Sequence, residues 1–444
     1  MCGILSKKII FSTPLFRWRN GITFRDKISA FENSNFRLLW AGRVTSNMAR
    51  QMRVFLRAWI VWEISKSPFL LGFVTSSLAW PMLFMPFVGG FLADKVDRKK
   101  LLKYTEVSLT ILWAIVASLV YFEIIEWWHF VVSSVMSGII QSIGRPGHQA
   151  ILGSIVTKKQ LPNAVALDNI AETWPRVAGP ALGGLLIAII GTGWLFILTS
   201  IGQLFTAITI FLLKWDPEEQ KLKQDSKKTK YPFFEGFKHV WREKVLLGLI
   251  AIGFAFAMVG SAAMFLLPIF ADAILGVGAS GLGYIMTAST IGTSIGALIV
   301  VMLSEFKYRG YLLFFVAMAN TIVILAFSRS EIFMLSLILV FFMGMSQMMF
   351  RSMRMIAMQI LTPNELRGRV LSFETTVQGT TWIGTLIMGS IAEYLTHNKI
   401  YVGTITLGGN AMNGAADAVL IGGVLYGAIS IIFFGIFGSM RRFR

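Results

Sequence analysis

The fold is decided by the segment Gly90-Phe-Leu-Ala-Asp-Lys-Val-Asp-Arg-Lys-Lys-Leu-Leu102, which lies between two long apolar stretches. Six of the seven residues from Asp94 to Lys100 are charged. Such a charged turn is typical of a helix that leaves a bilayer and returns as a second helix. A weaker copy follows 211 residues later, with Glu305 in the place of Asp94. A charged turn repeated in both halves of a chain predicts two related helical bundles that move against each other.

The composition is that of an integral membrane protein. The chain is 55% hydrophobic and 14% charged, and its mean hydropathy is +0.67, whereas a soluble chain of this length needs far more charge. Its apolar stretches are near-continuous over about 18–27 residues, which predicts spanning helices rather than the strands of an outer-membrane barrel. The single cysteine excludes a disulfide within the chain. We expect twelve spans, near residues 37–63, 69–93, 101–123, 128–152, 164–190, 194–213, 245–271, 280–303, 311–328, 332–357, 369–395 and 418–438.

The net charge of +18 is distributed unevenly between the two ends of these spans. The tails and the even-to-odd connections hold most of the lysines and arginines, whereas the opposite loops hold three, Lys66, Arg329 and Lys399. By the positive-inside rule, both termini face the cytoplasm. We therefore expect a multi-pass protein of a plasma membrane, such as the bacterial inner membrane. Because topology accounts for the basic residues, we expect no nucleic-acid partner.

One polar stretch divides the chain into halves. Residues 214–244 combine a charged linker with a segment from Phe233 to Trp241 that could form an amphipathic helix on the membrane surface. We expect a basic cytoplasmic tail over residues 1–36, a six-helix bundle over 37–213, the cytoplasmic linker over 214–244, a second six-helix bundle over 245–438 and a basic tail over 439–444.

An internal repeat supports this division. The segment 156–165 resembles 361–370 at an offset of 205, and the same offset relates Gly179 to Gly384 and Gly184 to Gly389. Each segment leads into a span, the fifth and the eleventh. Two six-helix halves in parallel repeat are a transporter architecture, with the binding sites between the halves. The predicted fold class is therefore an all-α membrane protein of twelve helices in two pseudo-repeat bundles.

With these motifs the chain resembles the major facilitator superfamily. The superfamily signature between the second and third helices, roughly G-x-L-A-D-R-x-G-R-K, is matched at Gly90, Leu92, Ala93, Asp94, Arg98 and Lys99. Asp97 replaces a glycine of that signature. Together with Arg145-Pro146, Leu161–Leu167, Arg176–Gly184 and Leu366–Ser372, this variant is similar to the enterobactin-exporter and macrolide-efflux branch.

The resemblance implies two gating elements. The first is the cluster Gly90, Asp94, Asp97, Arg98 and Lys99, which in the family holds the outward-open state closed at its cytoplasmic side against the eleventh helix, where Glu374 is the candidate partner. The second is the motif Gly179, Pro180, Gly183 and Gly184 in the fifth span, which matches the core of a motif found in drug–proton antiporters. Ordinary positive-inside loop chemistry and close helix packing are the alternative interpretations of the two elements.

Arginines within the spans are the unusual chemistry of the chain. Arg43, Arg50, Arg53 and Arg57 are spaced by seven, three and four residues, so they share an arc of about 80° on one helix. A cation inside a membrane is costly and usually faces the bundle interior or an aqueous cavity. The alternatives are snorkelling to headgroups and structural pairing. The predicted cargo-binding residues are Arg43, Arg50, Arg53, Arg57, Arg176, Gln347, Arg351, Arg354 and Trp382, and their charge favours an anionic cargo.

Acidic residues in the fifth span are candidates for coupling transport to protons. Asp168, Glu172 and Arg176 follow one another at intervals of four, with acid preceding base. Glu172 could exchange a proton as its pairing with Arg176 changes, or it could form a permanent ion pair. Glu106 and Glu374 are weaker coupling candidates.

We therefore expect a secondary transporter that exports a medium-sized organic molecule, such as an anionic siderophore-like or drug-like compound, by proton antiport and alternating access. The alternatives are uptake, lipid translocation by the same fold, and a receptor or scaffold that no longer transports. No nucleophile–base pair, nucleotide loop or metal-ligand spacing suggests an enzyme. We expect no cofactor and no metal, and the proton gradient as the driving force. We also expect a monomeric protein whose partners are the cargo and the lipid bilayer.

Overall fold

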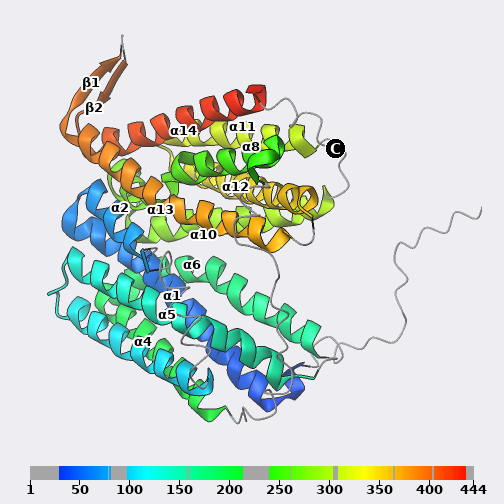
Figure 1. The fold of residues 1–444 in the computed structure, drawn as a ribbon. Coiled ribbons are helices and arrows are strands. Elements are labelled where there is room, and N and C mark those ends of the chain that lie inside the picture. The colour runs from blue at the N-terminus through cyan, green and yellow to red at the C-terminus, as the bar shows by residue number, and fades with distance from the viewer. Residues whose placement is uncertain are drawn as a thin grey trace, which may run out of the picture.

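The computed structural model describes residues 30–78, 80–81, 98–157, 160–213, 240–260, 262–303, 309–363, 366–402 and 405–436. Nearly all of these residues are helical (Figure 1). Among them, seven helical stretches are long and apolar enough to cross a membrane by length and composition. The predicted fold class, an all-α membrane protein of two helical bundles, is confirmed. Residues 1–29 of the predicted N-terminal tail, residues 214–239 of the predicted linker and the predicted C-terminal tail lie outside the described residues. The last residues of the predicted N-terminal tail are already helical, since α1 begins at Ser34.

The N-terminal bundle contains α1 (Ser34–Ser65), α2 (Pro68–Ser77), α4 (Arg98–Tyr121), α5 (Trp127–Ile155) and α6 (Leu161–Leu212). The beginning of α1 is capped by Asn33, whose side chain accepts hydrogen bonds from the backbone N–H groups of Asn35 and Phe36. α6 contains both the fifth and the sixth predicted span. Its two arms meet at Gly191, where φ is 77° and ψ is 172°, a conformation that suits glycine. The short loop expected between these spans is thus a sharp bend at one glycine.

The C-terminal bundle contains α8 (Lys244–Ala255), η3 (Phe256–Gly260), η4 (Ala262–Leu266), α9 (Leu267–Ile269), η5 (Phe270–Ile274), α10 (Gly278–Met302), α11 (Arg309–Ser328), α12 (Phe333–Leu361), α13 (Arg367–His397), β1 (Lys399–Val402), β2 (Ile405–Gly408) and α14 (Ala411–Ile436). Two features differ from the expectation. The seventh span is broken into short α, π and 3-10 segments, and a two-stranded hairpin lies between α13 and α14. Pro268 contributes to the break because it lacks a backbone N–H and cannot continue the helical hydrogen-bond pattern.

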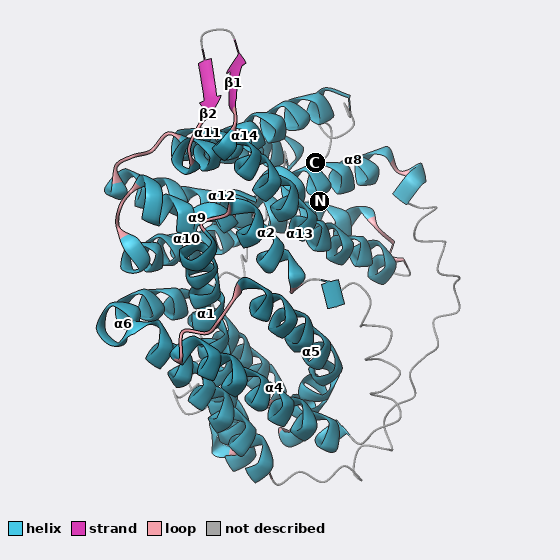
Figure 2. Ribbon diagram, turned by 90° about the vertical axis from the view of Figure 1, so that its left-hand side faces the viewer, coloured by secondary structure: helices cyan, strands magenta, loops and turns pink. Residues whose placement is uncertain are grey.

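The two ends of the bundles differ in how they are packed. We call the end near the hairpin the hairpin end, and the opposite end, where α1 begins and α14 ends, the basic end. α6 lies against α10 and α2 lies against α13 where the bundles meet (Figures 1 and 2). The largest apolar cluster joins residues of both bundles, including Trp62 and Leu71 with Phe265 and Phe270. Two further clusters, around Phe36 and around Phe350, each belong to one bundle. The bundles therefore share a core towards the hairpin end and have separate cores towards the basic end.

Candidate functional site between the bundles

Glycines allow the two bundles to touch backbone to backbone at the hairpin end. A Cβ placed on Gly184 of α6 would lie 2.8 Å from the Cα of Gly283 in α10, and a Cβ on Gly72 of α2 would lie 2.7 Å from the carbonyl oxygen of Thr385 in α13. Larger residues would force these helices apart. Of the predicted gating motif, Gly184 is at this contact. Gly179 and Gly183 instead pack against α1 within the N-terminal bundle.

Two carboxylates of the C-terminal bundle bind the end of α1 and the beginning of α2. Asp272 Oδ2 accepts hydrogen bonds from Trp62 Nε1 at 2.8 Å and from Lys66 Nζ at 2.7 Å. Glu393 Oε2 accepts from Ser67 Oγ at 2.8 Å and from the backbone N–H of Phe69 at 3.2 Å. These contacts join the bundles at the hairpin end.

Sequence reasoning did not identify these contacts as functional. The available signal was weak but present, since Asp272 and Glu393 are acids near the ends of mostly apolar stretches. Their partners come from the other half of the chain, and no local spacing reveals such a pairing.

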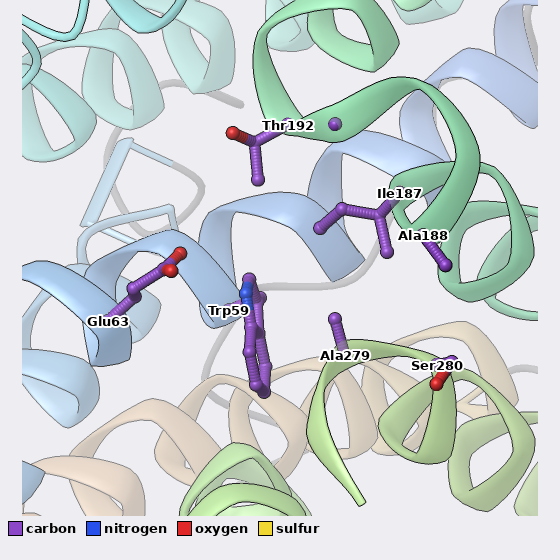
Figure 3. Close-up of a pocket in the computed structure, with 8 residues that line it drawn as sticks. Trp59, Glu63, Ile187, Ala188, Thr192, Ala279 and Ser280 are labelled. Atoms are coloured by element: carbon purple, nitrogen blue, oxygen red, sulfur yellow. The ribbon is translucent and has the colours of Figure 1, made fainter.

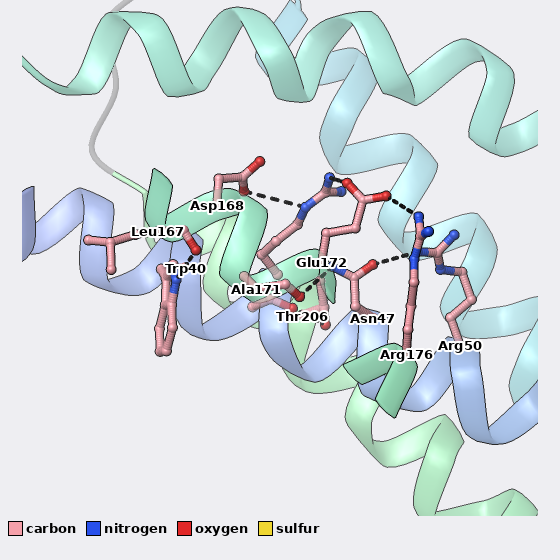
Figure 4. A network of polar contacts seen from close by, with 11 residues as sticks. Trp40, Asn47, Arg50, Leu167, Asp168, Ala171, Glu172, Arg176 and Thr206 are labelled. Atoms are coloured by element: carbon pink, nitrogen blue, oxygen red, sulfur yellow. Dashed lines mark hydrogen bonds and ion pairs between the residues drawn. The ribbon is translucent and has the colours of Figure 1, made fainter. Parts of the chain in front are cut away.

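An arginine–carboxylate cluster lies on α1 and α6 towards the basic end (Figure 4). Arg43 Nε lies 3.5 Å from Asp168 Oδ1, and Arg43 Nη2 lies 3.7 Å from Glu172 Oε2. Arg176 Nη2 donates to Glu172 Oε1 at 2.6 Å. Glu172 is therefore shared by two guanidinium groups from different helices. The side chain of Arg176 is 53% exposed, and those of Arg43 and Glu172 are 29% and 33% exposed, so an incoming ligand can reach them.

Arg50 extends this cluster along α1. Its Nη2 donates to Asn47 Oδ1 at 2.9 Å, and Asn47 Nδ2 donates to the carbonyl oxygen of Ala171 at 2.9 Å. Asn47 is buried, and this bond fixes α1 against α6. We call Arg43, Arg50, Arg176, Asp168 and Glu172 the arginine face.

The other two arginines of α1 lie inside the N-terminal bundle. Arg53 is 5% exposed, and its guanidinium donates to the carbonyl oxygen of Thr199 at 3.0 Å and to Gln203 Oε1 at 3.2 Å. Its Cζ also lies 4.5 Å from the centre of the Trp113 ring. Arg57 is 8% exposed and donates to Ser134 Oγ at 2.6 Å. The single cargo-facing stripe expected from the spacing is thus divided, because α4, α5 and α6 supply contacts for Arg53 and Arg57 inside the bundle.

The predicted cargo-binding residues of the C-terminal bundle also differ in how exposed they are. Arg354 is 2% exposed, and its guanidinium packs against Gly253 and donates to the carbonyl oxygen of Leu249 at 3.4 Å. Arg351 is exposed, whereas Gln347 and Trp382 are half-buried. Among the described residues, Gln347 Nε2 is buried and has no hydrogen-bond acceptor. Arg354 is therefore placed for structure, and Arg351 and Gln347 remain available for contact with a ligand.

Several predicted site residues cannot be compared with the structure. Gly90, Asp94 and Asp97 lie outside the described residues. Arg98 and Lys99 begin α4 and Glu374 lies in α13, but the structure does not describe their side chains. Their gating and coupling roles stay predictions. The described part of the chain holds no group of three or more His, Cys, Asp or Glu residues placed to bind a metal.

An open depression lies between the bundles at the hairpin end (Figure 3). Trp59 and Glu63 of α1, Ile187 and Thr192 of α6, and Ser280 of α10 are among its lining residues. It lies beside the bend at Gly191, on the side where the bundles share a core. The sequence did not predict it, and it is separate from the arginine face.

Comparison with known proteins identifies the family. Residues 26–428 match the family model described as a transmembrane secretion effector. The uncharacterised transporter YfiS of Bacillus subtilis is 27% identical over 52% of this chain and 57% of its own length, and YfmI of the same organism is 26% identical over 58% and 64%. The chain thus aligns with less than two thirds of either relative. The enterobactin exporter EntS of Shigella flexneri is 24% identical over 70% of this chain and 73% of its own length.

Solved structures confirm the fold. A bacterial homologue of the lysosomal transporter Spinster, in an inward-facing and unoccupied conformation, superposes with a TM-score of 0.68 at 13% identity, covering 95% of this chain and 98% of that one. The nucleoside transporter NupG superposes with a TM-score of 0.67 at 16% identity, covering 91% and 99%. The chain is therefore a multi-pass membrane protein of the major facilitator superfamily and belongs to its transmembrane secretion effector family.

Proposed function

We propose that this transporter exports a medium-sized organic anion from the cytoplasm by alternating access. The observation that carries the proposal is the arginine face, where three guanidinium groups converge with two carboxylates near the basic end. Guanidinium groups bind carboxylate and catecholate oxygens through directed hydrogen bonds. Export and a siderophore-like cargo are further supported by the similarity to the enterobactin exporter EntS.

In the cargo-free protein, Asp168 and Glu172 act as internal counter-ions for the arginines. An anionic cargo would displace them from Arg43 and Arg176, exchanging one ion pair for another at small net cost. Because these side chains are partly exposed, the ion pairs are weak enough to be replaced. Arg50 would add a third donor, and Arg351 and Gln347 would contact the cargo from the opposite bundle.

The packing of the bundles favours entry of cargo at the basic end. At the hairpin end the bundles share an apolar core and are joined through Asp272 and Glu393, whereas at the basic end their cores are separate. By the positive-inside rule, the basic end, where α1 begins and α14 ends, faces the cytoplasm. The conformation is then inward-facing, and cargo enters from the cytoplasm. The charged cluster from Gly90 to Lys99 would close this end, against Glu374, in the outward-facing state.

Coupling would proceed by proton antiport through Glu172. After cargo leaves on the outer side, a proton neutralises Glu172 and accompanies the return step. Loss of that proton to the cytoplasm restores the ion pairs with Arg43 and Arg176 before the next cargo binds. Asp168 and Glu374 are further candidates for carrying the proton.

The double pairing of Glu172 favours a second driving force for export. Two neighbouring guanidinium groups stabilise the charged form of Glu172, which makes this carboxylate less ready to carry a proton. An anion that leaves a cell with a negative interior is driven outwards by about 2.3 kcal/mol per charge for every 100 mV. Potential-driven export of the anion without protons is therefore the second candidate.

Everted membrane vesicles with an imposed pH gradient or an imposed potential distinguish the two mechanisms. The probe is labelled enterobactin, and the variants are wild type and Glu172→Gln. For antiport, the pH gradient drives accumulation in wild type and not in E172Q, while exchange of probe at equal concentrations continues in both. Equal pH-driven fluxes in the two proteins remove Glu172 from the coupling step, and a response to potential alone supports the second mechanism. Absence of any flux across a panel of organic anions would overturn export.

Charge selection is tested with dihydroxybenzoylserine and its neutral methyl ester. Arg50→Ala and Arg176→Ala should each lower transport of the carboxylate about tenfold, corresponding to about 1.4 kcal/mol, and change transport of the ester about twofold or less. Arg37→Ala is the matched control, because Arg37 is an exposed arginine of α1 outside the arginine face. Equal losses for both probes contradict selection by charge.

A further inference from the structure

The β1–β2 hairpin is too small to persist by itself. It pairs two strands of four residues, with Lys399 opposite Gly408, Ile400 opposite Leu407, Tyr401 opposite Thr406 and Val402 opposite Ile405. An isolated two-stranded hairpin of this size is marginally stable in water at best. The folded hairpin must therefore be stabilised by its attachment to the bundle and by the surface that contacts its strands.

The attachment at the base of the hairpin is firm. Asp417 of α14 is 1% exposed, and its carboxylate accepts a hydrogen bond from the backbone N–H of Gly408 at 2.7 Å. Arg329, in the connection between α11 and α12, places Nη2 2.7 Å from the other carboxylate oxygen. The backbone N–H of Gly409 donates to the carbonyl oxygen of Leu395 in α13 at 2.8 Å. The hairpin is thus held in a fixed direction relative to α13 and α14.

That direction runs across the helices rather than along them. In Figure 1 the strands point away from the ends of α13 and α14 at a steep angle to both helices, and in Figure 2 they extend past the outline of the helical bundle. If α13 and α14 cross the membrane, a hairpin with this direction extends sideways at the level where the helices leave the bilayer.

The two faces of the hairpin differ in composition. Directly paired residues share a face and successive residues alternate, so the register places Ile400 and Leu407 on one face. Both are aliphatic, and Ile400 is 36% exposed. The other face holds Lys399 and Thr406. The surface next to the base is also apolar, since Tyr394 of α13 and Met412 of α14 are 58% and 41% exposed.

We propose that the hairpin rests on the lipid surface at the hairpin end, with its aliphatic face towards the acyl chains. In the orientation proposed above this is the outer leaflet. The exposed apolar side chains Tyr394 and Met412 lie next to the base of the hairpin, at the ends of α13 and α14, which makes lipid the expected occupant. In water, a hairpin with an aliphatic face and few charges near its edges would be prone to aggregate. At the membrane surface, the aliphatic face would be shielded from water. The hairpin then fixes the outer end of α13 and α14 to the membrane surface, independently of the cargo.

The test uses the full-length chain with Cys2→Ser, carrying a single introduced cysteine labelled with the environment-sensitive dye NBD, in vesicles of phosphatidylcholine and phosphatidylglycerol. Ile400→Cys reports on the aliphatic face, and Thr406→Cys on the other face at almost the same distance along the hairpin. We expect lipids with a nitroxide near the headgroup to quench the dye at 400 strongly. We also expect aqueous iodide to quench it about threefold less than the dye at 406. Leu407→Cys, the cross-strand neighbour of 400, should repeat the result.

Two outcomes overturn the proposal. Equal iodide quenching at 400 and 406 would show that the hairpin stands in water. Protection of 400 from iodide without quenching by nitroxide lipids would show that protein, such as a second copy of the chain, covers the face. Monodisperse elution of each labelled variant before reconstitution confirms that it is folded.

Discussion

The first helices of the two bundles occupy equivalent places in the repeat and have opposite characters. α1 is continuous over 32 residues and carries four arginines between residues 43 and 57, whereas the seventh span, residues 244–274, is almost uncharged and is broken into five short segments. The two spans meet at the hairpin end, where Asp272 binds Trp62 and Lys66.

The difference indicates that α1 and the seventh span have different roles. A continuous helix can hold charged groups at fixed positions, and α1 uses this to present Arg43 and Arg50 while Arg53 and Arg57 bind neighbouring helices. A span with π and 3-10 segments has weaker and less regular hydrogen bonding, which is common at hinges. Binding chemistry is therefore concentrated in the N-terminal bundle, and the capacity to bend in the C-terminal bundle.

The largest expected effect concerns the buried part of α1. Arg53→Ala removes the hydrogen bonds to Thr199 and Gln203 and the contact with Trp113. Because hydrogen bonds from a charged group contribute about 1.5–3 kcal/mol, we expect the free energy of unfolding to fall by about 3 kcal/mol. Denaturation in mixed SDS micelles measures this change. Arg37→Ala, at the exposed beginning of the same helix, should cost about 0.5 kcal/mol or less. Equal losses would mean that the contacts of Arg53 do not stabilise the bundle.

The second prediction concerns the break in the seventh span. Pro268→Ala restores a backbone N–H and permits a continuous helix through α9. We expect the free energy of unfolding to change by about 1 kcal/mol or less. We also expect the exchange of probe across the vesicle membrane to slow about tenfold, which corresponds to about 1.4 kcal/mol on the rate-limiting barrier. Pro81→Ala, at a described and buried proline of the N-terminal bundle, is the control. An unchanged exchange rate in P268A would show that the break in the seventh span does not affect the rate-limiting step of transport.

The sequence predicted the two helical bundles and the arginines of α1. It did not predict the break in the seventh span. Long apolar stretches and the repeated charged turn depend on local composition, so the helical bundles followed from them. The break at Phe256–Ile274 did not, because an apolar run with one proline looks the same whether its helix is regular or strained. The spacing correctly placed Arg43, Arg50, Arg53 and Arg57 on one helix. It could not show that Arg53 and Arg57 are hydrogen-bonded inside the bundle, since their partners Thr199 and Ser134 are distant in the sequence.

The third prediction concerns the contact between the two spans. Asp272→Asn removes the ion pair with Lys66 while an acceptor for Trp62 remains. Because Lys66 is 56% exposed, the pair should contribute about 0.5 kcal/mol, which corresponds to a roughly twofold shift towards opening at the hairpin end. The readout is the rate at which a maleimide labels Thr385→Cys in a Cys2→Ser chain, since Thr385 is 4% exposed between α2 and α13. Glu123→Gln, another acid at the hairpin end, should leave the rate unchanged. A rate in D272N equal to that of the parent would show that the pair does not hold the bundles together.

The smallest expected effect on stability separates binding residues from structural ones within the N-terminal bundle. Arg176 forms an exposed pair with Glu172 four residues earlier, and such helical pairs contribute about 0.3–0.5 kcal/mol. Arg176→Ala should therefore change the free energy of unfolding by about 0.5 kcal/mol or less while lowering transport of an anionic probe. A loss of stability as large as that of Arg53→Ala would identify Arg176 as a structural residue, and the arginine face would then lose its most exposed donor. A small loss of stability with a large loss of anion transport would show that this guanidinium is reserved for the ligand, because the folded protein gains little from it otherwise.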